Sequence, residues 1–380
     1  MTRKQFFVVL VALVVLLAAG LLLMRSRESA WNSGNSRIGQ RLMPGLKLEN
    51  VATIVIQDPG ATLTLVTRDG GWRVKERADF PADVERVRDL LLRLVELKVV
   101  QTETVAEAQR GRLQLLEPGK AQEGAGTRIE LKDGGGAVLG RLLLGKKVTA
   151  MVGGAAIGPE TGVSTGRYAM PGDGSGAVVL ISDALAQADA KPEPWLSKEL
   201  IRVERAKSIS ATGPDGKQRF AVSRDSEASD WKLAGGGKPD PGRVQDAASA
   251  LASMSLADVV ADPAKADTGL DRAIVVKAQT FDNLAYTIRI GAKAKDDRYY
   301  AAISASGDPP AARIAGKGES AEEKAKQDKA FEERRTKLAD RLVHEKSLDR
   351  WTYLVPKSSV EPLLRERAQF LPEKKVAKKP

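Results

Sequence analysis

An internal repeat constrains the fold of this 380-residue chain most strongly. Residues 46–56 and 201–211 carry matching patterns in which a short apolar-polar stretch leads into an alternating, apolar-rich stretch. Each copy continues with a turn rich in Gly, Pro and Asp, a second alternating stretch, and a tryptophan, Trp72 or Trp231. Alternation of this kind, bounded by turn residues, predicts antiparallel β-hairpins that occur twice.

An amphipathic helix is predicted next in both copies. Pro81 and Pro241 are expected to open it, because proline is well tolerated at the first helical position. Apolar residues recur at helical spacing in each copy, as Val84, Val87, Leu91, Leu94 and Val95, and as Val244, Ala247, Leu251 and Met254. Val99-Val100 then corresponds to Val259-Val260. We interpret the agreement as a duplication.

Beyond these helices the two copies diverge in sequence. The first copy predicts strands near 127–131, 137–144 and 177–181, followed by a short helix. The second predicts strands at 273–278, 284–290, 299–304 and 351–355, followed by a helix over 360–367. The strand 353–355 with its trailing helix resembles 178–181 with its own.

The pattern as a whole predicts an α+β protein. A transmembrane helix precedes two tandem related repeats, each of antiparallel β-hairpins plus an amphipathic helix. The predicted boundaries are an N-terminal tip at 1–5, the transmembrane helix at 6–24, a linker at 25–44, repeat 1 at 45–199, repeat 2 at 200–367 and a basic disordered tail at 368–380.

The predicted transmembrane helix runs from Phe6 to Met24 without a charged or strongly polar side chain. A helix of this length reaches about 28 Å, close to the thickness of the hydrocarbon layer. The alternative is a cleaved signal peptide, but its apolar core is usually shorter, and here the apolar stretch continues beyond the small residues 18–20. A retained anchor is therefore favoured.

The orientation follows from the short basic N-terminus, which holds Arg3 and Lys4. The flank on the other side is equally basic, but long domains translocate largely regardless of charge. We therefore predict a single-pass protein of the bacterial inner membrane whose bulk is extracytoplasmic, in the periplasm. Its first partner is the lipid bilayer, through residues 6–24; a membrane-complex protein is the second.

A highly charged helical insertion is predicted at 316–350 within repeat 2. Its acids and bases nearly cancel, and Glu322 with Lys326 and Glu333 with Lys337 are spaced for pairing across one helical turn. The stripe of Phe331, Leu338 and Leu342 is thin. Such a segment is typical of a solvated helix laid on the body of a protein, with a partner-binding helix as the alternative.

Composition limits the possible chemistry. The chain has no cysteine, which excludes disulfides, thiolate nucleophiles and cysteine-ligated metal sites. His344 is the single histidine, and we interpret it as a surface helix residue. The net charge of +11 is spread along the chain, apart from Lys374-Lys375 and Lys378-Lys379 in the tail, so nucleic-acid binding is not expected.

Two short motifs resemble catalytic signatures. Gly162-Val-Ser-Thr-Gly166 has the spacing of a hydrolase nucleophile elbow, yet its flanks do not predict a strand-to-helix turn. Gly140-Arg-Leu-Leu-Leu-Gly145-Lys146 approximates a phosphate-binding loop, but these residues predict a strand. Trp72 and Trp231 are expected to pack on the sheets. We predict no catalytic, cofactor-binding or metal-binding residue, and no cofactor.

Several of these residues carry a resemblance to a known family. They are Leu46-x-Leu48-x-x-Val51-x-x-Ile54, Leu65-Val66-x-Arg68-x-Gly70-Gly71-Trp72, Phe80-Pro81-Ala82-Asp83 and Gly166-Arg-Tyr168-Ala-Met-Pro171-Gly172. The chain resembles the bacterial family called domain of unknown function 4340. The resemblance implies a single-pass membrane protein, often linked with ABC-type transport systems of the gliding-motility kind, with no established activity. The charged insertion departs from the simplest pattern of that family.

The leading hypothesis is a non-enzymatic, membrane-anchored binding or scaffold protein of an envelope complex. One alternative is an enzyme that acts on an envelope polymer through carboxylates alone, which predicts two facing carboxylates with raised pKa values. The other is a polyanion or lipid-surface binder that uses the basic tail.

Overall fold

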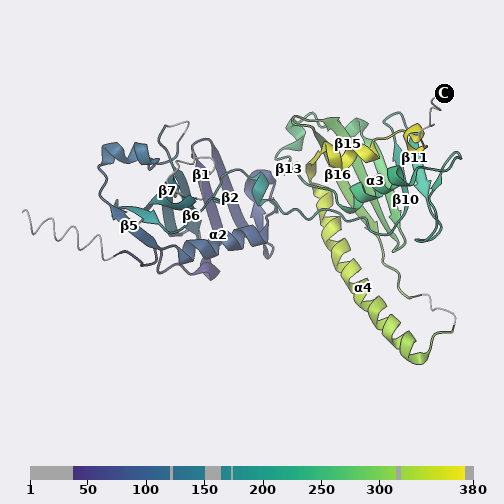
Figure 1. Ribbon diagram of the computed structural model, residues 1–380, viewed down its shortest axis with the longest axis horizontal. Helices are drawn as coiled ribbons and strands as arrows, with labels where there is room; N and C mark the ends of the chain where they lie inside the picture. The colour runs from purple at the N-terminus through teal and green to yellow at the C-terminus, as the bar shows by residue number, and fades with distance from the viewer. Residues whose placement is uncertain (1–36, 120–122, 150–163, 173, 314–317, 373–380) are drawn as a thin grey trace, which may run out of the picture. The chain divides into compact units, whose positions relative to one another are not determined.

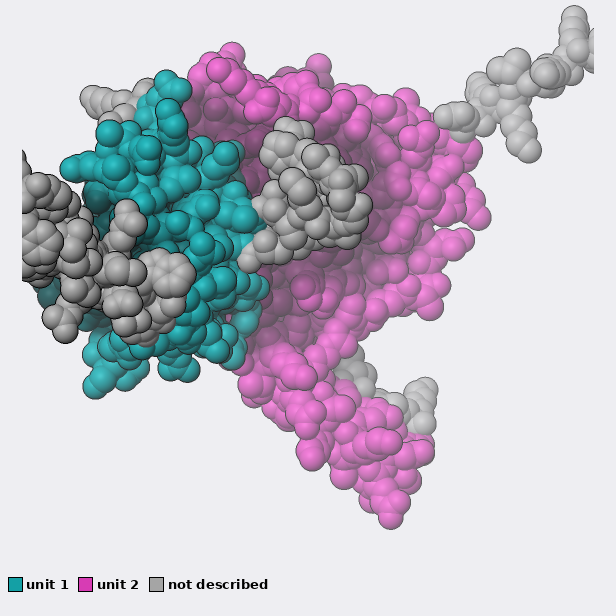
Figure 2. All heavy atoms as spheres, turned by 60° about the vertical axis from the view of Figure 1, so that its left-hand side comes forward, with its two compact units in different colours: residues 1–75, 81–195 teal, residues 76–80, 196–380 magenta. Residues whose placement is uncertain are grey.

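The computed structural model describes residues 37–119, 123–149, 164–172, 174–313 and 318–372. The chain divides into two compact units (Figure 2). Unit 1 comprises residues 1–75 and 81–195, and unit 2 comprises 76–80 and 196–380. Each unit is built around an antiparallel β-sheet with few helices, so the α+β class is confirmed.

Unit 1 contains, within its described residues, a nine-stranded sheet in the order β4-β3-β2-β1-β6-β7-β8-β9-β5 (Figure 1). The strands are β1 (Thr53–Asp58), β2 (Ala61–Arg68), β3 (Gly71–Val74), β4 (Phe80–Pro81), β5 (Val99–Glu103), β6 (Thr127–Lys132), β7 (Val138–Thr149), β8 (Ser164–Pro171) and β9 (Val178–Ile181). Helix α2 (Val84–Glu96) lies between β4 and β5 in the chain.

Unit 2 contains, in the part of the chain described, an eight-stranded sheet in the order β12-β11-β10-β14-β15-β16-β17-β13. The strands are β10 (Ala206–Thr212), β11 (Gln218–Ser223), β12 (Lys232–Leu233), β13 (Asp258–Val259), β14 (Ile274–Thr280), β15 (Leu284–Lys293), β16 (Arg298–Gly307) and β17 (Thr352–Pro356). The helices are α3 (Pro241–Ala252), α4 (Ala321–Ser347) and α5 (Lys357–Val360).

The two sheets share one topology. If β4 is set aside, the order of unit 1 maps strand for strand onto that of unit 2, with β1 on β10 and β9 on β17. Helices α2 and α3 interrupt the chain at the same place, after the first hairpin strands. The two copies keep this topology beyond the helices as well. Their sequences differ there, but backbone pairing depends on alternation rather than on residue identity.

The cores follow from this alternation. In β1, Ile54 and Ile56 are buried while their neighbours are not, and they lie opposite Leu65 and Leu63 of β2. In β10, Ile209 is buried in the same way. One face of each sheet therefore supplies the core, as expected for antiparallel sheets with one covered face.

The helices complete the cores with small departures from prediction. Pro241 opens α3 as expected, and the whole predicted stripe of the second copy is buried. Pro81 does not open α2. It lies in β4, and Asp83 caps the helix by accepting a hydrogen bond from the backbone N–H of Arg86 (3.1 Å). Val84 therefore lies in the first turn of α2 and is exposed, contrary to its place in the predicted stripe.

The short helix predicted after 177–181 is also wrong. The chain runs through turns to a 3₁₀ turn at Glu193–Trp195. Asp183 and Asp189 each accept a hydrogen bond from the backbone N–H two residues further on. Such local bonds compete with helix formation, and Pro192 and Pro194 interrupt it further.

Some residues within the predicted linker and tail take part in the folded units. Residues 39–42 pair with 97–99 of unit 1, through hydrogen bonds such as that from the Leu42 N–H to the Leu97 carbonyl (2.7 Å). At the other end, Phe370 is fully buried against Phe220, with ring centroids 4.4 Å apart. Apolar burial thus extends the folded body into residues that their composition placed outside it.

Among the described residues, every helix is too short or too polar to span a lipid bilayer. The predicted span at 6–24 lies outside the described residues.

Candidate binding cleft beside helix α4

Helix α4 is formed by the charged insertion of unit 2. Ser320 and Glu323 make a capping box at its start, in which each side chain accepts a hydrogen bond from the backbone N–H of the other. Nearly all side chains of the first ten residues are exposed. In Figure 1 these turns extend away from the sheet of unit 2. The first half of α4 is therefore an arm in solvent.

The C-terminal half of α4 is anchored to unit 2. Leu338 and Leu342 of the predicted stripe are buried, and Glu345 is fully buried between them and the end of the helix. Glu345 accepts hydrogen bonds from the hydroxyl of Tyr286 (2.8 Å) and from the backbone N–H of Arg202 (2.9 Å). Burial and the neighbouring carboxylate of Glu345 raise the pKa of Tyr286, so the phenol stays a donor.

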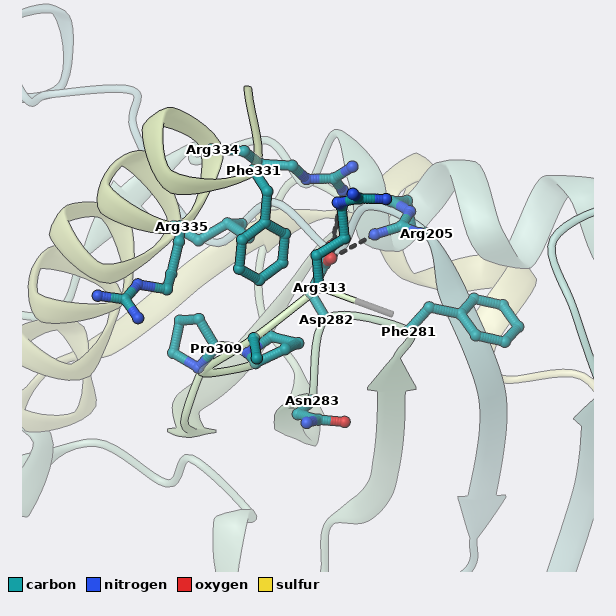
Figure 3. A pocket seen from close by; sticks show the side chains of 12 residues that line it. Arg205, Phe281, Asp282, Asn283, Pro309, Arg313, Phe331, Arg334 and Arg335 are labelled. Carbon is teal, nitrogen blue, oxygen red and sulfur yellow. Dashed lines mark hydrogen bonds and ion pairs between the residues drawn. The ribbon is translucent and has the colours of Figure 1, made fainter. Parts of the chain in front are cut away.

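A cleft of about 410 Å³ opens beside the middle of α4 (Figure 3). Its walls come from α4, from the turn between β14 and β15, from the segment after β16, and from Arg205. The lining residues are Arg205, Phe281, Asp282, Asn283, Pro309, Pro310, Ala312, Arg313, Phe331, Arg334, Arg335 and Leu338. Figure 3 shows the ring of Phe331 directed from α4 toward Pro309. The cleft thus combines apolar rings with guanidinium groups.

Asp282 is the buried charge of the cleft. Its side chain is 8% exposed and pairs with both Arg205 and Arg334, the latter at 3.0 Å. The turn that carries it is held by the Thr280 hydroxyl, which accepts the backbone N–H groups of Asp282 (3.3 Å) and Leu284 (3.1 Å). A carboxylate this buried is stable as an ion only when paired, so Asp282 fixes both arginines.

A second carboxylate supports Arg205 from outside. Glu227 accepts a hydrogen bond from Arg205 Nε (2.7 Å), and this contact lowers the pKa of Glu227. Arg205 itself has a left-handed backbone (φ 51°), a conformation that costs energy for a residue with a Cβ. Two charge contacts therefore hold a strained residue at the wall of the cleft.

Arg313 connects the segment after β16 to the arm. Its guanidinium binds Glu319 (2.6 Å) and Asp328 of α4 (3.0 Å), and its side chain is mostly buried. Arg335 adds a hydrogen bond to the carbonyl of Ala311 (3.1 Å). The wall formed by residues 309–313 is thus tied to α4 at two places.

The carboxylates with a displaced pKa lie outside the lining of the cleft. Among the described residues, the carboxylates with a displaced pKa are Glu130, Glu227, Asp297 and Glu323, and each pKa is lowered by a hydrogen bond or a nearby cation. A general acid needs the opposite shift. No group of three or more metal-ligating side chains occurs in the part of the chain that the structure describes.

His344, Trp72 and Trp231 do not line the cleft. His344 lies on α4, half-buried, beside Glu345. Trp72 lies in β3, and Trp231 precedes β12 with Arg224 stacked over its ring at 4.7 Å. The phosphate-loop spacing at 140–146 falls inside β7, so it does not form the loop that its chemistry needs. Of the hydrolase-like motif, Ser164–Gly166 begin β8, and residues 162–163 lie outside the described residues.

Sequence reasoning found part of the cleft and missed the rest. Phe331 and Leu338 were in the predicted stripe of α4, and both line the cleft. Asp282 and Arg205 were missed, because they lie far apart in the sequence and no motif marks either position. A charged residue next to a hairpin turn is common, so no local signal marks Asp282.

A family model supplies the comparison with known proteins. The model described as "Domain of unknown function (DUF4340)" matches residues 72–273 of the chain. The match spans the end of the first hairpin region, α2, the rest of unit 1, and unit 2 up to the start of β14. No curated protein matches the chain, and no solved structure matches it.

Proposed function

We propose, on the premise that the chain belongs to the DUF4340 family, that it is a non-enzymatic, membrane-anchored scaffold that binds a protein partner through the cleft beside α4. Residues 6–24 hold it in the inner membrane, with both units on the extracytoplasmic side. The resemblance to members linked with ABC-type transporters makes an accessory subunit of such an envelope complex the best candidate role.

The observation that carries the proposal is the composition of the cleft. Apolar surface from Phe331, Pro309 and Pro310 lies beside the guanidinium groups of Arg334 and Arg335, whose side chains are 47% and 42% exposed. Aromatic residues and arginines are the side chains that contribute most at protein interfaces. The exposed arm provides further polar surface around this centre.

The partner is expected to carry an apolar side chain flanked by a carboxylate. The apolar group would fill the space between Phe331 and the prolines, and the carboxylate would meet the exposed arginines. Since Asp282 already pairs with Arg205 and Arg334, it keeps these side chains extended along the wall before binding. Such preorganisation lowers the entropic cost of association.

Co-purification from the native host in mild detergent tests the proposal. The wild-type full-length chain should co-elute with a defined partner, and Phe331→Asp or Arg334→Glu should weaken binding at least about tenfold. Val343→Asp is the matched control, because Val343 lies on the same helix and is 72% exposed. A wild-type chain that repeatedly elutes alone as a monomer contradicts the proposal, and so does equal loss in the control.

A further inference from the structure

The edge of unit 1 next to the predicted linker has features of a membrane-contact surface. Residues 39–42 run antiparallel to 97–99, with Arg41 opposite Lys98. Because the pairing is antiparallel, Ile38 and Val100 lie at the same end of it. Both side chains are 47% exposed, among the few large apolar side chains exposed in the described residues. We call Ile38, Arg41, Lys98 and Val100 the edge patch.

The charge around the edge patch is positive. The stretches 37–50 and 96–100 contain four bases, Arg37, Arg41, Lys47 and Lys98, and two acids, Glu49 and Glu96, which leaves a net charge of +2. Arg41 and Lys98 are exposed, as is Glu96 at the end of α2. Apolar side chains beside exposed bases match the headgroup region of an anionic bilayer, where each base is attracted to the surface.

The length of chain before the edge patch keeps it close to the bilayer. Twelve residues, 25–36, separate the predicted span from Arg37. Covalent geometry limits their reach to about 43 Å even when fully extended. The hydrogen bonds of 39–42 then fix this attachment point on unit 1 itself. A weak surface contact so close to its target benefits from a high effective concentration.

We infer that the edge patch rests on the anionic lipid surface of the membrane that anchors the chain. The inference rests on the proposed function, since it requires the anchor at 6–24. It adds a second contact, in which Ile38 and Val100 enter the headgroup region and Arg41 and Lys98 pair with lipid phosphates. This contact orients unit 1 relative to the bilayer.

Site-specific fluorescence tests the contact directly, because the chain has no cysteine and a single introduced cysteine can be labelled cleanly. Full-length Val100→Cys is placed in nanodiscs of phosphatidylcholine, with or without phosphatidylglycerol, that contain a lipid-borne quencher. Val84→Cys is the control, since Val84 is 54% exposed in the same unit but lies on the first turn of α2.

The expected result is quenching of the label at position 100 that exceeds the control at least about twofold in discs with phosphatidylglycerol. Adding Arg41→Glu and Lys98→Glu should return it to the control level. Equal quenching at positions 100 and 84 overturns the inference. Quenching at position 100 that changes neither with the lipid charge nor with the Arg41→Glu and Lys98→Glu substitutions also overturns it. A chain that does not enter nanodiscs at all instead rejects the anchor and hence the proposed function.

Discussion

Glu345 lies in the last turn of α4, where a negative charge is normally unfavourable because it adds to the partial negative charge of the helix end. It is stable there because the Tyr286 hydroxyl and the Arg202 N–H both donate to it, and Arg341 lies 3.6 Å away. The residue thus exchanges water for three protein partners, and it fixes the point at which α4 leaves the sheet.

Replacing Glu345 tests this role. Glu345→Ala should lower the free energy of unfolding by about 3 kcal/mol, because it leaves the buried Tyr286 hydroxyl and the part-buried Arg202 N–H without their acceptor and leaves Arg341 with Glu204 as its carboxylate partner. Glu345→Gln keeps two acceptor lone pairs and should cost about 1 kcal/mol. Urea unfolding of the full-length chain in detergent measures both. Glu333→Ala, an exposed change on the same helix, is the control, and equal losses for all three variants would refute the role.

Glu130 provides a pH-dependent test at the residue scale. Its side chain is 11% exposed, and hydrogen bonds from Lys132 and Arg141 lower its pKa below the ordinary value of 4.5. A lowered pKa in the folded state stabilises the fold above pH 4.5, and this contribution disappears as the pH falls through the folded pKa.

Glu130→Gln should therefore reduce stability by about 1 kcal/mol at neutral pH. The difference from wild type should shrink as the pH is lowered below 4.5, because the wild-type carboxylate then takes up a proton. Urea unfolding across this pH range checks the effect. A difference that stays constant with pH would mean that the charge of Glu130 is not what stabilises the sheet.

At the element scale, α4 combines a solvent-exposed first half with an anchored second half. The thin apolar stripe predicted this helix correctly, but not the unequal burial of its two ends. Within α4, the described ion pairs join Arg335 to Glu332 and Arg341 to Glu345, and not the two pairs expected from spacing. Spacing allows several partners on a helix this charged, and only contacts with the body select among them.

The capping box makes a local prediction about the arm. Ser320→Ala should destabilise the first turn of α4 by about 1 kcal/mol, which speeds amide hydrogen exchange there roughly fivefold. Global stability should not change, since the side chains of this turn are exposed. Hydrogen exchange by mass spectrometry resolves the two effects. If protection from hydrogen exchange is lost along the whole of α4, the C-terminal half of the helix is not stable independently of the first half.

The hairpins show which elements sequence can specify. Period-two alternation and turn residues predicted the strands, and they also predicted that the same β-rich arrangement occurs twice. The predicted start of α2 was wrong. Pro81 and Asp83 are both of residue types that favour the start of a helix, and it is Asp83 that caps α2. Helix boundaries depend on such single hydrogen bonds, whereas helix existence depends on a long apolar pattern.

At the scale of the whole molecule, the two units contain sheets of the same topology with different additions. Unit 2 carries the 27-residue helix α4 between β16 and β17, whereas the equivalent connection in unit 1, between β8 and β9, consists of residues 172–177. The cleft exists only where this addition meets the β14–β15 turn. The pattern of apolar and turn residues predicts the fold that the two units share. It cannot predict a cleft that depends on ion pairs between distant residues, such as Arg334 and Asp282.

Membrane association of the intact chain is the measurement that tests the proposed function most directly. Cells of the native host are fractionated without detergent, the membranes are washed with alkaline carbonate, and the outer face is exposed to protease. The full-length chain should remain in the washed membranes, and both units should be digested only when the extracytoplasmic side is accessible. Recovery of the intact chain, with residues 6–24 still attached, in the soluble fraction would contradict it.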